Sequence, residues 1–293
     1  MSECRIKFWG VRGSVPAPGP STVHFGGNTP CVEVRAEGEI IVLDAGTGIR
    51  LLGTALAQEF GEKPIALTLL ISHPHWDHIH GFPFFLPAYC EKNKIHILGY
   101  ADFRLGLQNT LEGQMESPYF PIALKELQGN IVIDELCDVE FPIGAVRVRA
   151  HRANHPGIAM GYRLFTSAGS VVYLPDNEPF GSHRVSHIGT ADRVDEKFVE
   201  FARGADVLIT DAQYTGGEYE HHVGWGHACV NDVVGLAIEA GVKRLFLFHH
   251  DPGHDDAFIH AMLDGARNLA AAKGSALVID AAREGEEVVL GTG

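Results

Sequence analysis

The sequence predicts an α/β protein in which two β-sheets pack together and helices cover their outer faces. Short runs of β-favouring apolar residues fall into two series, the first between residues 5 and 98 and the second between residues 145 and 280. Stretches with the apolar spacing of helices lie among these runs. The chain has 293 residues, 45% of them hydrophobic, and can bury a substantial core in one large domain or in two smaller ones.

The first series of strands is expected at residues 5–9, 31–35, 39–43, 67–71 and 95–98. Residues 10–30 are rich in Gly and Pro, which argues against regular structure and favours a loop beside a site. Gly46, Thr47 and Gly48 resemble part of a phosphate-binding loop. Without its lysine and spacing, a tight turn into a helix at residues 49–60 is the favoured interpretation.

The middle of the chain is harder to interpret. Residues 81–89 are aromatic and Pro-rich; core packing is the favoured interpretation, and a substrate mouth is the alternative. Residues 101–138 give no clear pattern and could form a cap over a pocket.

The second series of strands is expected at residues 145–150, 159–165, 170–174, 206–210, 244–248 and 276–280. Helices are expected at residues 195–202, 231–240 and 255–273. In the second helix, Val230, Val233, Val234 and Ala237 follow helical spacing, and Gly241 marks its end.

Composition limits the function. The 37 acidic residues outnumber the 23 basic ones, giving a formal net charge of −14, which disfavours a partner that is a long nucleic acid. No apolar run is long enough to cross a bilayer and the N-terminus lacks a signal-peptide layout, so we expect a cytoplasmic protein without membrane contact. The five dispersed cysteines favour buried thiols over disulfides or a thiolate metal site.

The richest chemical motif follows the strand at residues 67–71. His73, His75, Asp77 and His78 offer four metal ligands within six residues, whereas a His-rich surface loop is the bland alternative. His73 and His75 can converge from one side, and the adjacent Asp77 and His78 must diverge, so one loop could serve two metal ions. Nitrogen and oxygen donors without sulfur suit two divalent ions, zinc first, with manganese or iron as substitutes.

The spacing H-x-H-x-D-H resembles the signature of the metallo-β-lactamase-fold hydrolases. This resemblance implies a four-layer αββα sandwich of two mixed sheets and a single hydrolase domain over residues 1–293. It also implies further ligands at His155, Asp176 and His249. The implied set is His73, His75 and His155 for one ion, Asp77, His78 and His249 for the other, and Asp176 as the bridge between them.

Some of these positions have neighbours that compete with them. His151 ends the strand before His155, and His250 is the alternative to His249 because a slip of one residue would exchange them. Glu178, two residues after Asp176, is interpreted as a solvated acid rather than as a support for the metal site.

Two later segments bear on the reaction. The strand at residues 206–210 leads into Asp211, and sixteen residues later His227 precedes a helix. This order resembles the phosphodiesterase branch of the superfamily, with ribonuclease Z and cyclic-phosphate enzymes, as do the segments FWGVRGSVP and HFGGNTPCVEV. It implies that Asp211 orients His227 and that His227 protonates the leaving alkoxide, which suits a group that titrates near neutral pH. A helix cap or a surface role is the alternative for His227.

The expected activity is cleavage of a small phosphodiester, such as a cyclic nucleotide, by a hydroxide that bridges two metal ions, with Asp77, Asp211 and His227 as catalytic residues. No basic arm for gripping transfer RNA is apparent, although a ribonuclease Z-like RNA endonuclease remains an alternative. Hydrolysis of a lactone or thioester and a non-catalytic metal-binding module are the others. The resemblance also suggests a homodimer.

Overall fold

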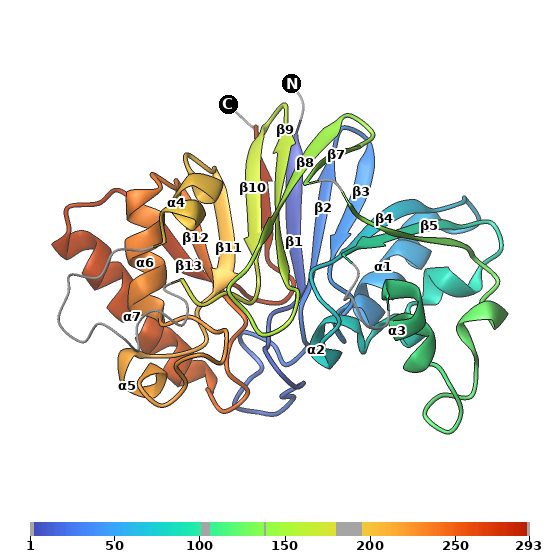
Figure 1. Cartoon of the computed structure of the whole chain (residues 1–293), viewed down its shortest axis with the longest axis horizontal. Coiled ribbons are helices and arrows are strands. Elements are labelled where there is room, and N and C mark those ends of the chain that lie inside the picture. Colours follow the sequence, from blue (N-terminus) through green and yellow to red (C-terminus); the bar gives the residue numbers. More distant parts are fainter. Residues whose placement is uncertain (1–2, 101–105, 138, 180–194, 292–293) are drawn as a thin grey trace.

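Two seven-stranded β-sheets pack face to face in the structure, with helices on the outer face of each, as the sequence predicts (Figure 1). The protein is described here by a computed structural model that covers residues 3–100, 106–137, 139–179 and 195–291. Both sheets are mixed, and the architecture is the four-layer αββα sandwich.

The N-terminal sheet has the strand order β14-β1-β2-β3-β4-β5-β6. Its strands are β1 (Cys4–Gly10), β2 (Cys31–Ala36), β3 (Glu39–Leu43), β4 (Ala66–Ile71), β5 (Lys94–Gly99), β6 (Asn130–Glu135) and β14 (Glu287–Leu290). Strands β3 to β6 are parallel, whereas β1 is antiparallel to both of its neighbours.

The C-terminal sheet has the order β13-β12-β11-β10-β9-β8-β7. Its strands are β7 (Glu140–Ile143), β8 (Val146–Arg152), β9 (Met160–Thr166), β10 (Gly169–Leu174), β11 (Val207–Asp211), β12 (Arg244–Phe248) and β13 (Val278–Ala281). Strands β10 to β13 are parallel, and β7 to β10 form antiparallel pairs. Each sheet therefore has a block of parallel strands whose carboxyl ends share one edge.

The helices are α1 (Ile49–Phe60), α2 (Trp76–Ile79), α3 (Leu107–Gly113), α4 (Glu196–Ala202), α5 (Gly216–Tyr219), α6 (Val230–Glu239) and α7 (Asp256–Ala272). Helices α4, α6 and α7 cover the C-terminal sheet, and α1 and α3 lie on the side of the N-terminal sheet (Figure 1). Helix α6 buries Val230, Val233, Val234 and Ala237, and Gly241 after it has a positive φ of 65°, as its predicted role as the stop requires.

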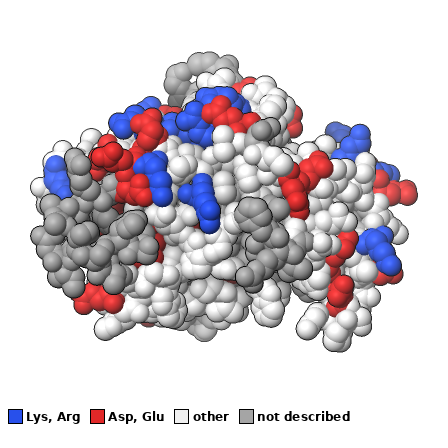
Figure 2. Space-filling view, in the orientation of Figure 1, with Lys and Arg blue, Asp and Glu red and all other residues white. Residues whose placement is uncertain are grey.

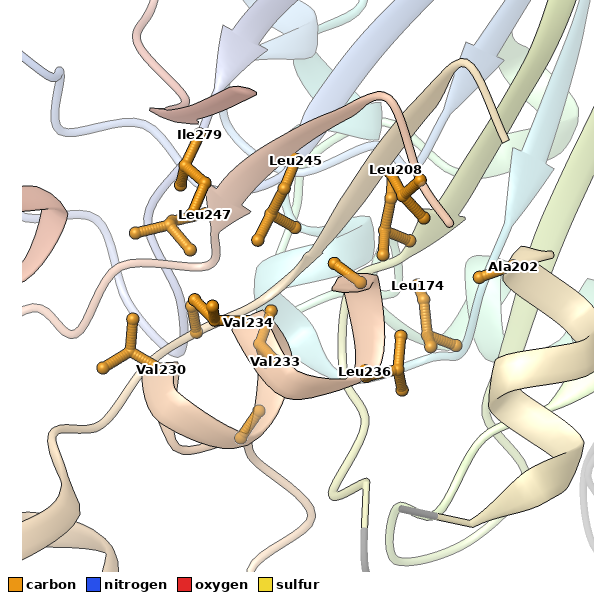
Figure 3. Close-up of a cluster of buried hydrophobic side chains, with 14 of the residues drawn as sticks. Leu174, Ala202, Leu208, Val230, Val233, Val234, Leu236, Leu245, Leu247 and Ile279 are labelled. Carbon is orange, nitrogen blue, oxygen red and sulfur yellow. The ribbon is translucent and has the colours of Figure 1, made fainter. Parts of the chain in front are cut away.

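Three apolar cores follow from this layering. Between the sheets, Phe8 and Phe246 are buried with their ring centroids 5.0 Å apart. Figure 3 shows a second core, in which Val233, Val234 and Leu236 of α6 lie beneath Leu208 and Leu245 of the C-terminal sheet. A third core lies between α1 and the N-terminal sheet and holds the side chains of two short 3₁₀ helices, Phe82–Phe84 and Leu86–Tyr89.

The aromatic stretch at residues 81–89 therefore serves mainly for packing. Phe82 and Phe85 are fully buried, which confirms the favoured interpretation, whereas Phe84 and Leu86 remain about half exposed.

Several elements were not predicted. The segment at residues 101–138 supplies α3 and the edge strand β6, which pairs with β5; residues 101–105 and 138 lie outside the described residues. No residue of β6 is fully buried, so the apolar run that marks an inner strand is missing. Strands β7 and β14 are four-residue edge strands, and α2 and α5 are too short to establish a helical period. Within the described part of the chain, no helix combines the length and apolar character needed to cross a bilayer.

Candidate metal centre

The candidate site lies where the parallel strands of both sheets end. Loops leave the carboxyl ends of β3 and β4 in one sheet and of β10, β11 and β12 in the other, and the turn between β8 and β9 joins them. Ligand sites in α/β proteins favour this edge because several loops converge there. All seven of the predicted metal ligands come together at this edge, in three overlapping groups.

The first group brings together His73, His75, His155 and Asp176, whose ligand atoms all lie within 4.8 Å of one another. Nε2 of His155 is 3.1 Å from Nδ1 of His75, although the two residues are eighty positions apart. Oδ2 of Asp176 lies 3.6 Å from Nε2 of His73 and 3.9 Å from Nε2 of His155. His75 is the exposed member and faces the entrance, whereas His73 and Asp176 are buried.

The second group consists of Asp77, His78 and His249, all of them buried. Oδ2 of Asp77 is 3.1 Å from Nε2 of His249 and 3.3 Å from Nε2 of His78. The divergence of the adjacent Asp77 and His78 from the first pair of histidines, expected from their spacing, is thus present.

Asp176 lies between the two groups. While its Oδ2 faces the first group, its Oδ1 lies 3.1 Å from Nε2 of His78 and 3.4 Å from Nε2 of His249. One carboxylate therefore presents one oxygen to each group, the arrangement that a bridging ligand needs.

Unpartnered buried atoms indicate what the site is built to hold. Nε2 of His73, Nε2 of His78 and Oδ1 of Asp176 are buried without a hydrogen-bond partner among the described residues. Leaving buried polar atoms unpaired is costly, and their convergence on a common space is what bound cations would satisfy. The donor set, with histidine nitrogens and carboxylate oxygens and no sulfur, fits zinc or a similar divalent metal.

The protonation states agree with this donor chemistry. Burial lowers the pKa values of His73, His75 and His155, which leaves their rings neutral, the form that binds metals. Burial also lowers the pKa of His78, but the carboxylates of Asp176 and Asp77 outweigh this effect and raise it. In the metal-free chain a proton on His78 balances these acids, and a divalent cation would replace it.

Further side chains fix the rings from behind. Asp44, at the end of β3, accepts hydrogen bonds from Nδ1 of His78 at 2.8 Å, from the Tyr173 hydroxyl at 2.7 Å and from the Ser72 hydroxyl at 2.8 Å. Such partners orient the metal-facing nitrogen of a histidine. Sequence reasoning missed Asp44. The signal was an acid at a strand end, parallel to the strand before the histidine motif, in a stretch interpreted only as a tight turn.

Two other rings are held in the same way. Nδ1 of His155 donates to the Gly226 carbonyl at 3.1 Å, and Nδ1 of His249 lies 3.1 Å from Oε1 of Gln213. The backbone N–H of Ser14 donates to Oδ2 of Asp77 at 2.7 Å, so the Gly- and Pro-rich N-terminal loop does lie beside the site.

The competing histidines point elsewhere. His250 is buried on the other side of the strand end, where Nε2 donates to the Ala282 carbonyl at 2.9 Å. His151 packs against Phe198 and Phe201, with its ring 5.1 Å from that of Phe201.

The interpretation of Glu178 as a solvated acid was wrong. Its side chain is only 2% exposed and accepts hydrogen bonds from the hydroxyl of Tyr219 and from the backbone N–H groups of Gly224 and Gly226. Because Gly226 in turn holds His155, Glu178 braces the metal site from a distance. A single acid beside Asp176 could not reveal partners more than forty residues away.

The predicted pair of Asp211 and His227 is formed beside the second group. Nδ1 of His227 donates to Oδ2 of the fully buried Asp211 at 2.7 Å. Burial lowers the pKa of His227, but the Asp211 carboxylate outweighs this and raises it to about 9. His227 also forms the third group, with Asp176 and His249, so its ring stands next to the space enclosed by the ligands.

The charge around the molecule is mixed. Figure 2 shows acidic and basic side chains interspersed over the upper part of this face, and no continuous basic stripe among the described residues drawn there. A basic stripe is the usual footprint of a protein that grips a long nucleic acid.

An αββα sandwich with histidine and carboxylate ligands gathered at its strand ends defines a metal-dependent hydrolase of the metallo-β-lactamase fold. Residues 40–250 match the family model described as the Beta-lactamase superfamily domain, and the chain belongs to this family.

Known proteins resemble the chain over almost its whole length. A ribonuclease Z of Picrophilus torridus is 20% identical, and the match covers 92% of each chain. The metallo-β-lactamase-fold protein YhfI of Bacillus subtilis superposes with a TM-score of 0.65 at 16% identity, covering 98% of this chain and 99% of that one. A diphosphatase of the PhnP family superposes with a TM-score of 0.66 at 16% identity, covering 97% of each.

Proposed function

We propose that this protein is a two-metal phosphodiesterase that acts on a small or cyclic nucleotide. The observation that carries the proposal is the pair of Asp211 and His227 beside the ligand cluster. A hydrolase that expels a poor leaving group needs a proton donor at that place, whereas a metal-storage site does not.

In this proposal the ligands divide as the structure groups them. His73, His75 and His155 hold one ion, Asp77, His78 and His249 hold the other, and Asp176 contacts both. Zinc is the metal that this donor set favours. Two such ions would supply an acidified water as nucleophile and positive charge that stabilises the phosphoryl oxygens.

His227 serves as the proton donor. With its pKa near 9, the ring is protonated at neutral pH, and the hydrogen bond to Asp211 fixes its Nδ1 so that Nε2 is left to act on the substrate. Transfer of that proton to the departing alkoxide leaves a neutral imidazole, which regains its proton from water.

A small substrate suits the surface better than a long one. The net charge of −14 and the mixed charges around the molecule repel polyanions, while a single phosphodiester needs only the local field of the bound cations. RNA cleavage is the second candidate, because the Picrophilus torridus relative is named ribonuclease Z.

Two measurements test the proposal. Purified protein should contain about two metal ions per chain and hydrolyse bis(p-nitrophenyl) phosphate. His227→Ala should lower kcat by roughly a hundredfold or more at unchanged metal content, since a general acid contributes about 10² to 10⁴ in rate.

The matched control is His96→Ala. His96 forms a similar pair with Asp134, at 2.7 Å, but it lies exposed on β5, and its loss should leave kcat unchanged. If His227→Ala turns over at the parent rate, His227 has no catalytic part. Turnover of a precursor transfer RNA, a lactone or a thioester, with every small phosphodiester refused, would replace the proposed substrate class.

A further inference from the structure

Two tryptophan side chains near the metal centre are exposed to solvent. Trp76 is 79% exposed and Trp225 is 60% exposed, in a chain whose other large aromatic side chains are mostly buried. An indole offers a large flat apolar surface that is usually covered by other groups. Two such surfaces beside a reaction centre therefore suggest a ligand.

Both tryptophans are tied to the same pair of metal-site histidines. Trp76, the first residue of α2, lies in the chain between His75 and Asp77. Trp225 precedes Gly226, whose carbonyl accepts the hydrogen bond from Nδ1 of His155. His75 and His155 are in contact, with 3.1 Å between ring nitrogens, so the two indoles belong to segments on either side of the more exposed group.

The support beneath Trp225 is firm. Buried Glu178 accepts hydrogen bonds from the backbone N–H groups of Gly224 at 3.0 Å and Gly226 at 3.2 Å, one on each side of the tryptophan. The ring of His222 meets the indole edge-on, with 4.8 Å between centroids. An exposed side chain on a fixed backbone loses little freedom when it binds a ligand.

The two segments offer faces and not charges. Neither residues 73–81 nor residues 221–228 contain a lysine or arginine. They are therefore poorly suited to a phosphate, which the metal site can bind, and well suited to a flat uncharged ring. Aromatic side chains bind nucleobases in this way, by stacking on the π face that every base has.

We propose that Trp76 and Trp225 form the binding surface for the base of a nucleotide substrate, an inference that rests on the proposed phosphodiesterase function. The base stacks on the indoles while its phosphodiester lies over the metal site. The enzyme then prefers phosphodiesters that carry a base to those that do not.

The preference can be measured directly. The probes are adenosine 2′,3′-cyclic phosphate and methyl ribofuranoside 2′,3′-cyclic phosphate, which differ only in the base. The ratio of their KM values should favour the first by about tenfold in the parent protein, because stacking contributes about 1–3 kcal/mol per base. Trp76→Ala and Trp225→Ala should each bring the ratio toward one, and the phenylalanine variants should retain part of it.

The matched control is Val278→Ala, which trims an equally exposed apolar side chain at the opposite end of its parallel strand. It should leave the KM ratio at the parent value. A ratio that the tryptophan variants do not change would overturn the inference, as would equal losses on both substrates. A change in oligomeric state on gel filtration, with the ratio preserved, would instead assign the tryptophans to contact with a second copy of the chain.

Binding separates this inference from the proposed reaction. Quenching of tryptophan fluorescence by adenosine 5′-monophosphate needs no turnover. If the parent protein cleaves neither substrate but binds the nucleotide about tenfold more tightly than the tryptophan variants do, the base surface stands and the phosphodiesterase proposal fails. If the parent protein cleaves both substrates with equal KM, the reaction stands and the base surface fails.

Discussion

His249 and His250 are neighbours in the chain, yet their rings have different surroundings. The ring of His249 joins the metal ligands, and His249 adopts a positive φ of 59°, a conformation uncommon outside glycine. That backbone conformation sends the next side chain away from the ligand cluster, so His250 is buried against Phe25 and donates to Ala282. The sequence offered both histidines, and only the backbone geometry separates them.

The buried ring of His250 should make the metal-free protein sensitive to acid. Burial lowers its pKa to about 3 in the folded chain, against about 6.5 when unfolded. Stability from the neutral ring is thus fully present above pH 6.5 and is lost as the pH falls toward 3. Between pH 7 and pH 5, in EDTA, the parent should lose about 2 kcal/mol more unfolding free energy than His250→Gln.

Urea denaturation at the two pH values measures this difference, and the glutamine can still donate to the Ala282 carbonyl. Equal losses in both proteins would show that His250 titrates normally in the folded state.

At the scale of elements, the N-terminal loop supports the site without supplying a metal ligand. Gly13 lies against the ring of His249, and a Cβ there would come within 2.4 Å of its Nδ1. That ring is fixed by Gln213 and Asp77 and cannot move freely. Gly13→Ala should therefore displace His249 and weaken metal binding by about tenfold or more, the usual effect of disturbing a ligand's support.

Titration with zinc against a competing chelator measures this change. The control is Gly265→Ala in α7, where an added Cβ meets nothing within 4 Å. It should keep the parent affinity and raise stability slightly, by about 0.5–1 kcal/mol, because alanine favours a helix. Unchanged zinc affinity in Gly13→Ala would mean that His249 does not depend on this loop.

Elements with a strong internal pattern were predictable. Inner strands such as β4 and β12 are continuous apolar runs, and α6 and α7 have a clear helical period, so their ends were placed within one or two residues. Edge strands β6, β7 and β14 draw their stability from pairing with a neighbour, which no local pattern records. In the same way the motif histidines were evident, whereas Asp44 and Glu178 depend on partners that only the fold brings near.

At the scale of the molecule, the candidate ligands join the two halves of the sandwich. His73, His75, Asp77 and His78 follow a strand of the N-terminal sheet, whereas Asp176 and His249 follow strands of the C-terminal sheet. Ions bound between them would be released on unfolding and should stabilise the fold.

Removal of metal with EDTA should consequently lower the melting temperature, and added zinc should restore it. At a free zinc concentration about 100 times Kd the gain is about 2.7 kcal/mol for each site. His78→Ala should respond less to zinc than the parent does. Identical melting curves with and without zinc would contradict a metal centre that spans the two sheets.

The wide separation of the ligands along the chain has a consequence for biosynthesis. A growing polypeptide that has emerged from the ribosome only as far as β11 carries the histidine motif but not His249, and neither the gap between the sheets nor the second ion's site is complete. Metal loading as proposed here is then a late event, after translation has passed β12, and a truncated product would be left without an active centre.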